Sequence, residues 1–142
     1  MTRTRTTDEY NQPIIQEFRE NGGKVGGIFE KFNMLLLHTI GVKSGKERVN
    51  PVLYFILDDR WYILASDGGT PTHPYWYYNV LAHPNVTFET GKETLEAQFV
   101  VLPREERDRI YQQLIVIYPP LIEYQINAGA RVIPIIEVIR NR

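Results

Sequence analysis

Residues 49–65 read VNPVLYFILDDRWYILA, and this stretch decides the fold class of the chain. Aromatic and β-branched side chains fill both of its halves, which is typical of strands in a half-buried sheet. Asp58 and Asp59 separate the two halves, and such a polar pair between apolar runs indicates a tight turn. We therefore predict a β-hairpin with strands over residues 49–57 and 61–65.

Four more strands follow when the chain is read outward from this hairpin. One is the apolar run at residues 34–39, and another is the last strand, at residues 132–139. Residues 86–90 and 94–102 predict a second hairpin around a Gly-Lys turn. Six strands and a few helices in one chain predict an α+β barrel. The order of the strands does not follow from the sequence.

The helices are predicted from periodicity and from proline and glycine signals. Residues 8–20 place Ile14, Ile15 and Phe18 on one side, and glycines follow at the end of this segment. A second helix begins near Pro74 and runs to about Ala82, and a third covers residues 104–113 after a proline. A short segment, residues 119–127, leads into the last strand.

The totals indicate one domain in a reducing compartment. The chain has 142 residues, 43% of them hydrophobic, which is enough for one core. We expect a single domain over residues 1–142, in which residues 1–30 are a helix and a glycine-rich connector. Cysteine is absent, so disulfides, thiolate metal sites and cysteine nucleophiles are excluded.

The location and the classes of partner are also predicted from the totals. The first residues lack the apolar core of a signal peptide, and the apolar runs are shorter than the roughly 20 residues that span a bilayer. The net charge is −1, which gives no general attraction to nucleic acid. We expect a cytoplasmic protein without nucleic-acid partners or stable membrane insertion, although a lipid-soluble substrate could bring it transiently to a membrane surface.

Residues 41–48, GVKSGKER, carry the first candidate site. Three cations stand on a glycine-containing turn between two predicted strands. Glycine allows the backbone to approach a ligand, and Lys and Arg bind phosphate or carboxylate oxygens. The spacing differs from that of a P-loop. The alternative is a solvated hairpin tip, and the composition of the turn leaves both interpretations open.

Residues 65–79, ASDGGTPTHPYWYYN, carry the second candidate site. A strand end passes into a helix through small residues, and such a junction can offer backbone N–H groups to an anionic or planar ligand. The four aromatic residues from Tyr75 to Tyr78 cannot all face one core, because successive helical side chains diverge by about 100°. At least one is expected to line a pocket or a subunit interface. The alternative is that Trp76 is a core residue covered by the tyrosines.

Other chemistries have little support in the sequence. The histidines His38, His73 and His83 have no metal-ligand spacing, so we expect no metal site. Neither serine lies in a nucleophile-elbow motif, which argues against covalent hydrolysis. Tyr118 and Tyr124 flank a proline pair and suit either the edge of a substrate cavity or a helix packed on the barrel.

Taken together, these segments resemble the deazaflavin-dependent nitroreductase family. The resemblance covers nearly the whole chain, from residues 17–27 to residues 131–134, and its most specific parts are residues 41–51 and 65–79. It implies a split β-barrel of the FMN-binding type, with about six mostly antiparallel strands, an N-terminal helix and peripheral helices. It also implies coenzyme F-420, a planar deazaflavin with a phosphate and an oligoglutamate tail.

The resemblance assigns a role to individual residues of this chain. Lys43 and Arg48 are expected to hold the phosphate and the tail carboxylates, with Lys46 adding charge at the rim. Tyr118, Tyr124 and Ser66 are the expected catalytic or substrate-orienting residues. The remaining expected cofactor contacts are Pro51, Val52, Leu53, Ala65, Ser66, Asp67, Gly68, Trp76 and Asn79.

Two positions depart from the family pattern. Asp67 stands where many relatives have lysine, so a negative charge comes close to an anionic cofactor. Coulomb repulsion at about 4 Å costs on the order of 1–4 kcal/mol, depending on the effective dielectric constant. Leu121 stands where some relatives have another tyrosine, which predicts a different range of acceptors.

The implied activity is hydride transfer from the reduced deazaflavin to a small electron-poor acceptor, such as a quinone, an activated alkene or a nitro compound. The alternatives are an FMN-dependent oxidoreductase of the same barrel class, a non-catalytic deazaflavin carrier or storage protein, and an oligonucleotide-binding barrel. The exposed aromatic run also suits a homodimer. The sequence leaves the physiological acceptor open.

Overall fold

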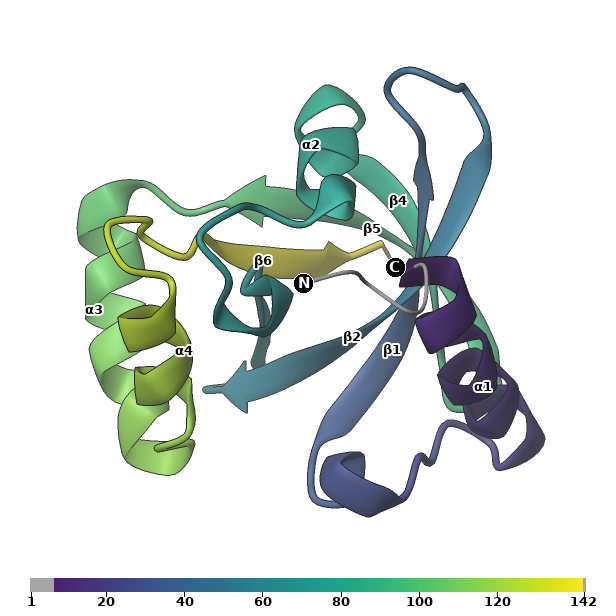
Figure 1. Cartoon of the computed structure of the whole chain (residues 1–142), viewed down its shortest axis with the longest axis horizontal. Coiled ribbons are helices and arrows are strands. Elements are labelled where there is room, and N and C mark those ends of the chain that lie inside the picture. Colours follow the sequence, from purple (N-terminus) through teal and green to yellow (C-terminus); the bar gives the residue numbers. More distant parts are fainter. Residues whose placement is uncertain (1–6, 142) are drawn as a thin grey trace, which may run out of the picture.

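The computed structural model describes residues 7–141, which form a β-barrel with helices around it (Figure 1). The strands are β1 (Asn33–Ile40), β2 (Glu47–Leu57), β3 (Arg60–Leu64), β4 (Asn85–Thr90), β5 (Glu93–Val101) and β6 (Ile135–Arg140). The helices are α1 (Thr7–Glu20), η1 (Gly27–Phe29), η2 (Asp67–Gly69), α2 (Tyr75–Ala82), α3 (Arg104–Ile117) and α4 (Leu121–Asn127). None of the helices in the described chain is long and apolar enough to cross a membrane.

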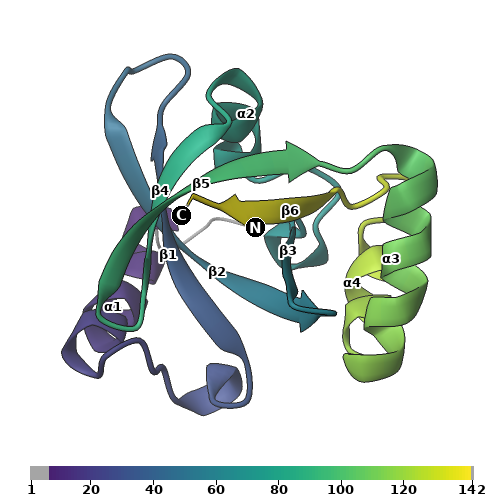
Figure 2. The same cartoon turned by 180° about the vertical axis from the view of Figure 1, so that it is seen from behind.

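The six strands close into a barrel in the order β1-β2-β3-β6-β5-β4, and every neighbouring pair is antiparallel (Figure 2). The α+β barrel predicted from the sequence is therefore confirmed. The closure depends on β6, which inserts between β3 and β5 although β4, β5 and the helices η2, α2, α3 and α4 separate it from β3 in the chain. Because this pairing joins distant segments, no local signal in the sequence could have predicted it.

The β2–β3 hairpin forms as predicted. Asp58 and Asp59 have φ angles of 53° and 63°, so both central residues of the turn are left-handed, as a type I′ hairpin requires. Leu57 pairs with Arg60 directly beside this turn. Aspartate tolerates the left-handed region better than most residues, which explains why this pair of residues can make the turn.

Three boundaries near the C-terminus differ from the prediction. Helix α3 continues to Ile117, beyond the predicted end at residue 113, and the segment before the last strand contains α4. The strand β6 begins at Ile135, not at Val132. The physical reason is that Ile133 bonds to helix side chains. Its N–H donates to Oε1 of Gln125 at 3.0 Å, and its carbonyl accepts from Nε of Arg107 at 2.9 Å.

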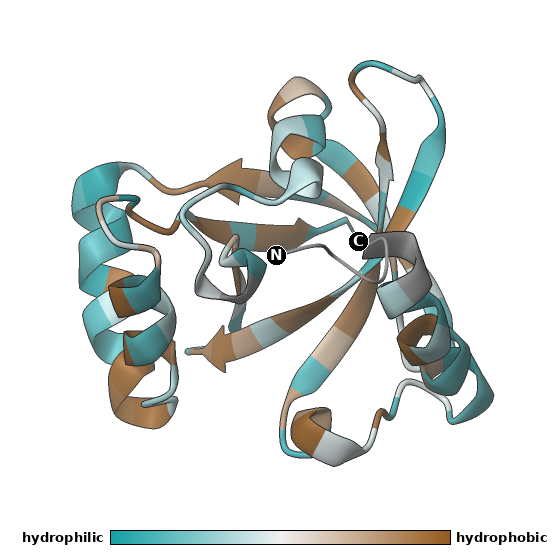
Figure 3. Cartoon of the chain, viewed as in Figure 1, coloured by the Kyte–Doolittle hydropathy of each residue, from teal (hydrophilic) through white to brown (hydrophobic). Residues whose placement is uncertain are grey.

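Apolar side chains form a core inside the barrel and two smaller clusters outside it. Figure 3 shows hydrophobic residues along the strands and hydrophilic ones along much of α3. The barrel core includes Leu35, Ile63 and Phe88, all fully buried. A second cluster joins the barrel to α3 and α4, and a third lies under α1, where Ile15 and Phe18 are buried as the helical pattern predicted. The helices α1 and α3–α4 thus cover opposite sides of the barrel, and α2 lies beside the β1–β2 turn (Figure 1).

Candidate active site

A cavity of about 700 Å³ lies between the β1–β2 turn and α2. The two segments that the sequence singled out, residues 41–48 and 65–79, both contribute to its wall. The lining residues are Gly41, Val42, Lys43, Ser44, Arg48, Asn50, Tyr75, Trp76, Tyr78 and Asn79. The volume lies within the range of about 300–1,000 Å³ that is usual for sites that bind small molecules and cofactors.

The backbone of the β1–β2 turn holds its cations beside the cavity. The N–H of Gly41 donates to the carbonyl of Lys46 at 2.8 Å, and the N–H of Gly45 donates to the carbonyl of Gly41 at 2.9 Å. Gly45 has a φ of 69°, and a Cβ on Gly41 would lie 2.5 Å from Oγ of Ser44. Position 45 therefore favours glycine, a side chain at position 41 would displace the hydroxyl of Ser44, and the tight turn brings Lys43 to the cavity wall.

Asn79 connects α2 to this turn. Its Oδ1 accepts from the N–H of Val42 at 3.1 Å, and its Nδ2 donates to Oγ1 of Thr39 at 3.1 Å. Asn79 is 7% exposed and Thr39 is 4% exposed, so this link is buried. The carboxamide is thus engaged with the protein itself, and its contribution to the cavity is to fix the residue that precedes Lys43.

The aromatic residues of α2 divide between the core and the cavity, as their helical spacing predicted. Trp76 is buried against the barrel core and also lines the cavity. Tyr75 and Tyr78 line the cavity from more exposed positions, with exposed fractions of 86% and 49%. Tyr77 turns away and packs on His73, with ring centroids 4.6 Å apart. The expectation that at least one of these residues lines a pocket is confirmed.

The other expected cofactor residues do not line this cavity. Val52 packs against the barrel core, Leu53 against the two outer clusters, and Ala65 is fully buried. Pro51 lies in β2 opposite Leu36. Residues 65–74 form the β3–α2 connector, which begins with Ala65 and Ser66. Asp67 and Gly68 lie in its short helix η2. Their roles toward a cofactor stay predictions.

The two candidate substrate tyrosines pack in the cluster between the barrel and the helices. The ring of Tyr118 contacts that of Phe55 edge-on at 4.6 Å. Tyr124 is half-buried in α4, and its backbone lies so close to Gly69 that a Cβ on this glycine would be 3.0 Å from Cα of Tyr124. Tyr124 therefore lies beside the β3–α2 connector. Leu121 is 2% exposed and packs in the same cluster, and its effect on the range of acceptors stays a prediction.

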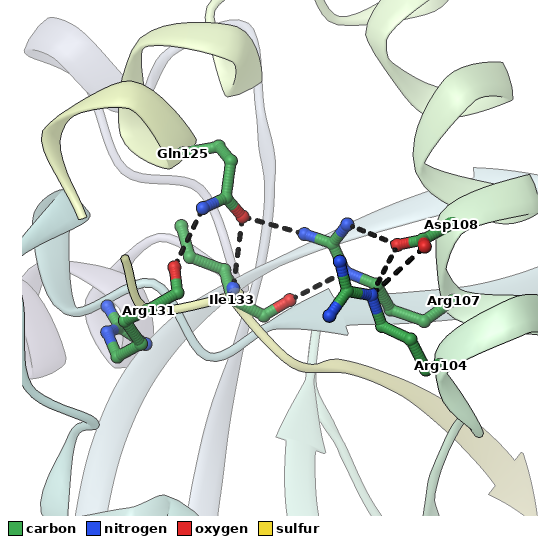
Figure 4. A network of polar contacts seen from close by, with 6 residues as sticks. All are labelled: Arg104, Arg107, Asp108, Gln125, Arg131 and Ile133. Carbon is green, nitrogen blue, oxygen red and sulfur yellow. Dashed lines mark hydrogen bonds and ion pairs between the residues drawn. The ribbon is translucent and has the colours of Figure 1, made fainter. Parts of the chain in front are cut away.

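Two arginines that sequence reasoning did not select organise this region (Figure 4). Arg131 binds the β3–α2 connector, which lies 58 to 66 positions earlier in the chain. Arg107 is 6% exposed and donates to the carbonyl of Ile133 and to Oε1 of Gln125. Gln125 in turn donates to the carbonyl of Arg131 at 2.7 Å. Because these contacts join distant segments, no spacing in the sequence could have revealed them.

His38 belongs to an ionic cluster on the side of the barrel that α1 covers. Its Nε2 lies 2.6 Å from Oε2 of Glu89, and Arg19 donates to both oxygens of the same carboxylate at 3.0 and 2.7 Å. The hydrogen bond from Arg19 is the main cause that lowers the pKa of Glu89, and the contact with His38 lowers it further. This cluster anchors α1 to β4.

A second cavity, of about 320 Å³, lies between the β2–β3 hairpin and α3. Arg60 and Arg109 line it, but Glu137 lies 4.0 Å from Arg60 and Glu106 lies 3.7 Å from Arg109. These carboxylates offset the positive charge, so the smaller cavity has no net attraction for an anion. The larger cavity is therefore the candidate active site.

The fold and the site together define a closed six-stranded α+β barrel with basic and aromatic residues on one cavity. Residues 12–139 match the model of the F-420H(2)-dependent quinone reductase family, so the chain belongs to that family. An F-420H(2)-dependent quinone reductase of Mycobacterium tuberculosis is 42% identical over 57 residues. That alignment covers 40% of this chain and only 38% of the relative, so the chain spans well under half the length of this relative.

Solved structures support the same placement. An F-420H2-dependent reductase has 37% sequence identity and a TM-score of 0.62, and the match covers 74% of this chain and 92% of that one. A structure described as a domain-swapped dimer has 31% identity and a TM-score of 0.64, and the match covers 89% of this chain and 94% of the other. Both matches cover most of this chain.

Proposed function

We propose that this chain is an F-420H(2)-dependent reductase that delivers a hydride to a quinone, with activated alkenes and nitro compounds as further acceptors. The observation that carries the proposal is the cavity that places Lys43 and Arg48 beside the aromatic residues of α2. We also propose that residues 1–142 act as one deazaflavin-binding domain. The names of the relatives support a quinone as the acceptor.

The residues of the cavity fit the chemical groups of this cofactor. Guanidinium and ammonium groups form charge-assisted hydrogen bonds to phosphate and carboxylate oxygens, which the deazaflavin carries on its tail. Trp76, Tyr75 and Tyr78 offer aromatic surface to a planar ring. The turn that holds Lys43 is preformed by its own hydrogen bonds, so little ordering is required on binding.

When bound, the reduced deazaflavin supplies the hydride, and the work of the protein is binding and orientation. Lys43 and Arg48 bind the anionic tail, and Asn79 fixes the backbone before Lys43. Tyr75 and Tyr78 flank the cavity and would offer apolar surface to the ring. For Ser66, Tyr118 and Tyr124 we propose hydrogen bonds that orient the acceptor. Equal turnover by the Tyr124→Phe variant on a quinone, an enone and a nitro compound would rule out that role for Tyr124.

The decisive experiment is a fluorescence titration of the purified protein with F-420 and, in parallel, with FMN. The Lys43→Ala/Arg48→Ala variant is compared with Arg60→Ala/Lys92→Ala, which removes the same charge at exposed positions outside the cavity. We expect the first variant to lose about 3 kcal/mol of binding, roughly 100-fold in Kd for F-420, and the control to lose little.

Each other outcome points to one alternative. Selective FMN binding assigns the chain to the flavin-dependent branch, and binding of neither cofactor overturns the proposal. Tight F-420 binding without turnover on any acceptor identifies a carrier or storage protein. A loss of F-420 affinity that is equal in both double variants would assign the effect to net charge and remove Lys43 and Arg48 from the site.

We further propose that the protein forms a homodimer in the cytoplasm and contacts membranes only transiently. The dimeric structure among the similar proteins and the exposed Tyr75 support the first part. Light scattering after size-exclusion chromatography tests it, and a monomeric mass at micromolar concentration would contradict it.

A further inference from the structure

The side chain of Arg131 binds the β3–α2 connector through all three of its nitrogen atoms. Nε donates to the carbonyl of Thr70 at 3.0 Å, and Nη2 donates to the carbonyls of Ser66 and Thr70, both at 2.7 Å. Nη1 donates to the carbonyl of Ala65 at 2.8 Å and lies 3.1 Å from Nδ1 of His73. One guanidinium thus holds four residues of the connector.

These bonds set the direction of the peptide groups that follow. The peptide bonds of the described chain are trans, and in a trans peptide the C=O and the next N–H point in opposite directions. Because the carbonyls of Ala65 and Ser66 point at Arg131, the N–H groups of Ser66 and Asp67 point away from it. Two successive backbone donors are therefore presented on the other side of the connector.

The backbone at Ser66 and Asp67 has a conformation that the contacts with Arg131 help to stabilise. Ser66 has helical angles, with φ of −82° and ψ of −34°, whereas Asp67 has a φ of 50°. A left-handed residue after a helical one brings successive N–H groups together in a form that binds anions. Aspartate tolerates the left-handed region less well than glycine, so the contacts of the connector help to stabilise it.

Arginine is the side chain best suited to hold several backbone carbonyls at once. Its planar group offers five donors in a fixed geometry, whereas lysine offers three and carries them on one atom. Its own backbone is held by Gln125, which accepts from the buried Arg107 (Figure 4). Burial lowers the pKa of Arg131, and the negative charge of Asp67 opposes this effect.

We propose that Arg131 is a positioning residue for the cofactor: it holds the carbonyls of the β3–α2 connector so that the N–H groups of Ser66 and Asp67 face the ligand. The assignment of the ligand rests on the proposed function. The preorganised donors bind anionic or carbonyl oxygens without a cost of ordering at the moment of binding. A charged contact between Arg131 and the cofactor is not part of the proposal.

The test compares Arg131→Lys and Arg131→Gln with Arg109→Gln, a change of an exposed arginine on α3. Amide hydrogen exchange is measured on the protein without cofactor, followed by F-420 titration and by the KM for a soluble quinone. We expect exchange in residues 65–73 to rise about tenfold or more in both Arg131 variants, with β1 and β4 unchanged. We expect the Kd for F-420 to rise by a similar factor while the KM for the quinone stays constant.

The outcomes separate this inference from the proposed function. Unchanged exchange in residues 65–73 of a folded Arg131→Gln variant overturns the inference, whatever the cofactor does. Faster exchange with an unchanged Kd for F-420 also overturns it, because the connector would then be ordered without serving the ligand. If the wild-type protein binds no F-420, the proposed function fails. The exchange data still decide whether Arg131 orders the backbone of the connector.

Discussion

The link between α2 and the basic turn predicts a measurable loss of stability when Asn79 is changed to Ala. The substitution leaves the buried hydroxyl of Thr39 and the N–H of Val42 without their partner. An unsatisfied buried group costs about 1–3 kcal/mol, and the N–H beside the turn costs about 1 kcal/mol because water reaches it more easily. We therefore expect the free energy of unfolding to fall by about 2–4 kcal/mol.

Urea denaturation followed by circular dichroism measures this change, and the melting temperature is expected to fall by roughly 6–12 °C for a domain of this size. A double-mutant cycle with Thr39→Val isolates the buried contact, with an expected coupling energy of about 1 kcal/mol. The exposed Asn85→Ala serves as the control. A change of less than about 0.5 kcal/mol for Asn79→Ala would refute the reasoning.

Three further predictions follow from the buried and charged contacts. Arg107→Met leaves a buried carbonyl and a carboxamide without a donor, so urea denaturation is expected to show a loss of about 3–5 kcal/mol. Burial and then the charge of Arg131 lower the pKa of His73, so its neutral form stabilises the folded protein. This stability is present above pH 6.5 and is lost as the pH falls below it, and His73→Gln should flatten the pH profile of the melting temperature in that range. The hydrogen bond from Arg19 lowers the pKa of Glu89, so the stability from this carboxylate is present above pH 4.5 and is lost in more acidic solution. A Glu89→Gln variant that keeps the acid dependence of the wild type would contradict this assignment.

The parts of the fold that could be predicted from the sequence are those with local signals. The hairpin at Asp58 and Asp59, the turn around Gly45 and the division of the α2 aromatics all depend on residues a few positions apart. The strand order that closes the barrel and the late start of β6 could not be predicted, because they depend on pairing between β3 and β6 and on the side chains of Gln125 and Arg107.

The same distinction between local signals and long-range contacts applies to the candidate site. Lys43 and Trp76 are brought to one cavity as the motifs and the resemblance predicted together. Asn79 was expected as a cofactor contact, and the structure adds a buried structural role that its position in a helix could not reveal. Arg131 was missed because nothing in the local sequence indicates which carbonyls a distant guanidinium will hold.

The surroundings of Asp67 reduce the repulsion that its negative charge would exert on an anionic cofactor. The expected repulsion of about 1–4 kcal/mol applies to a carboxylate about 4 Å from an anion with no compensating charge. Asp67 is exposed, its Oδ2 accepts from Oγ1 of Thr70 at 3.0 Å, and its charge interacts favourably with Arg131. Solvent screening and this neighbouring cation both reduce the repulsion. If the proposed function holds, the connector therefore needs no lysine at this position to tolerate an anion, because we propose that it contributes backbone geometry and that the β1–β2 turn supplies the positive charge.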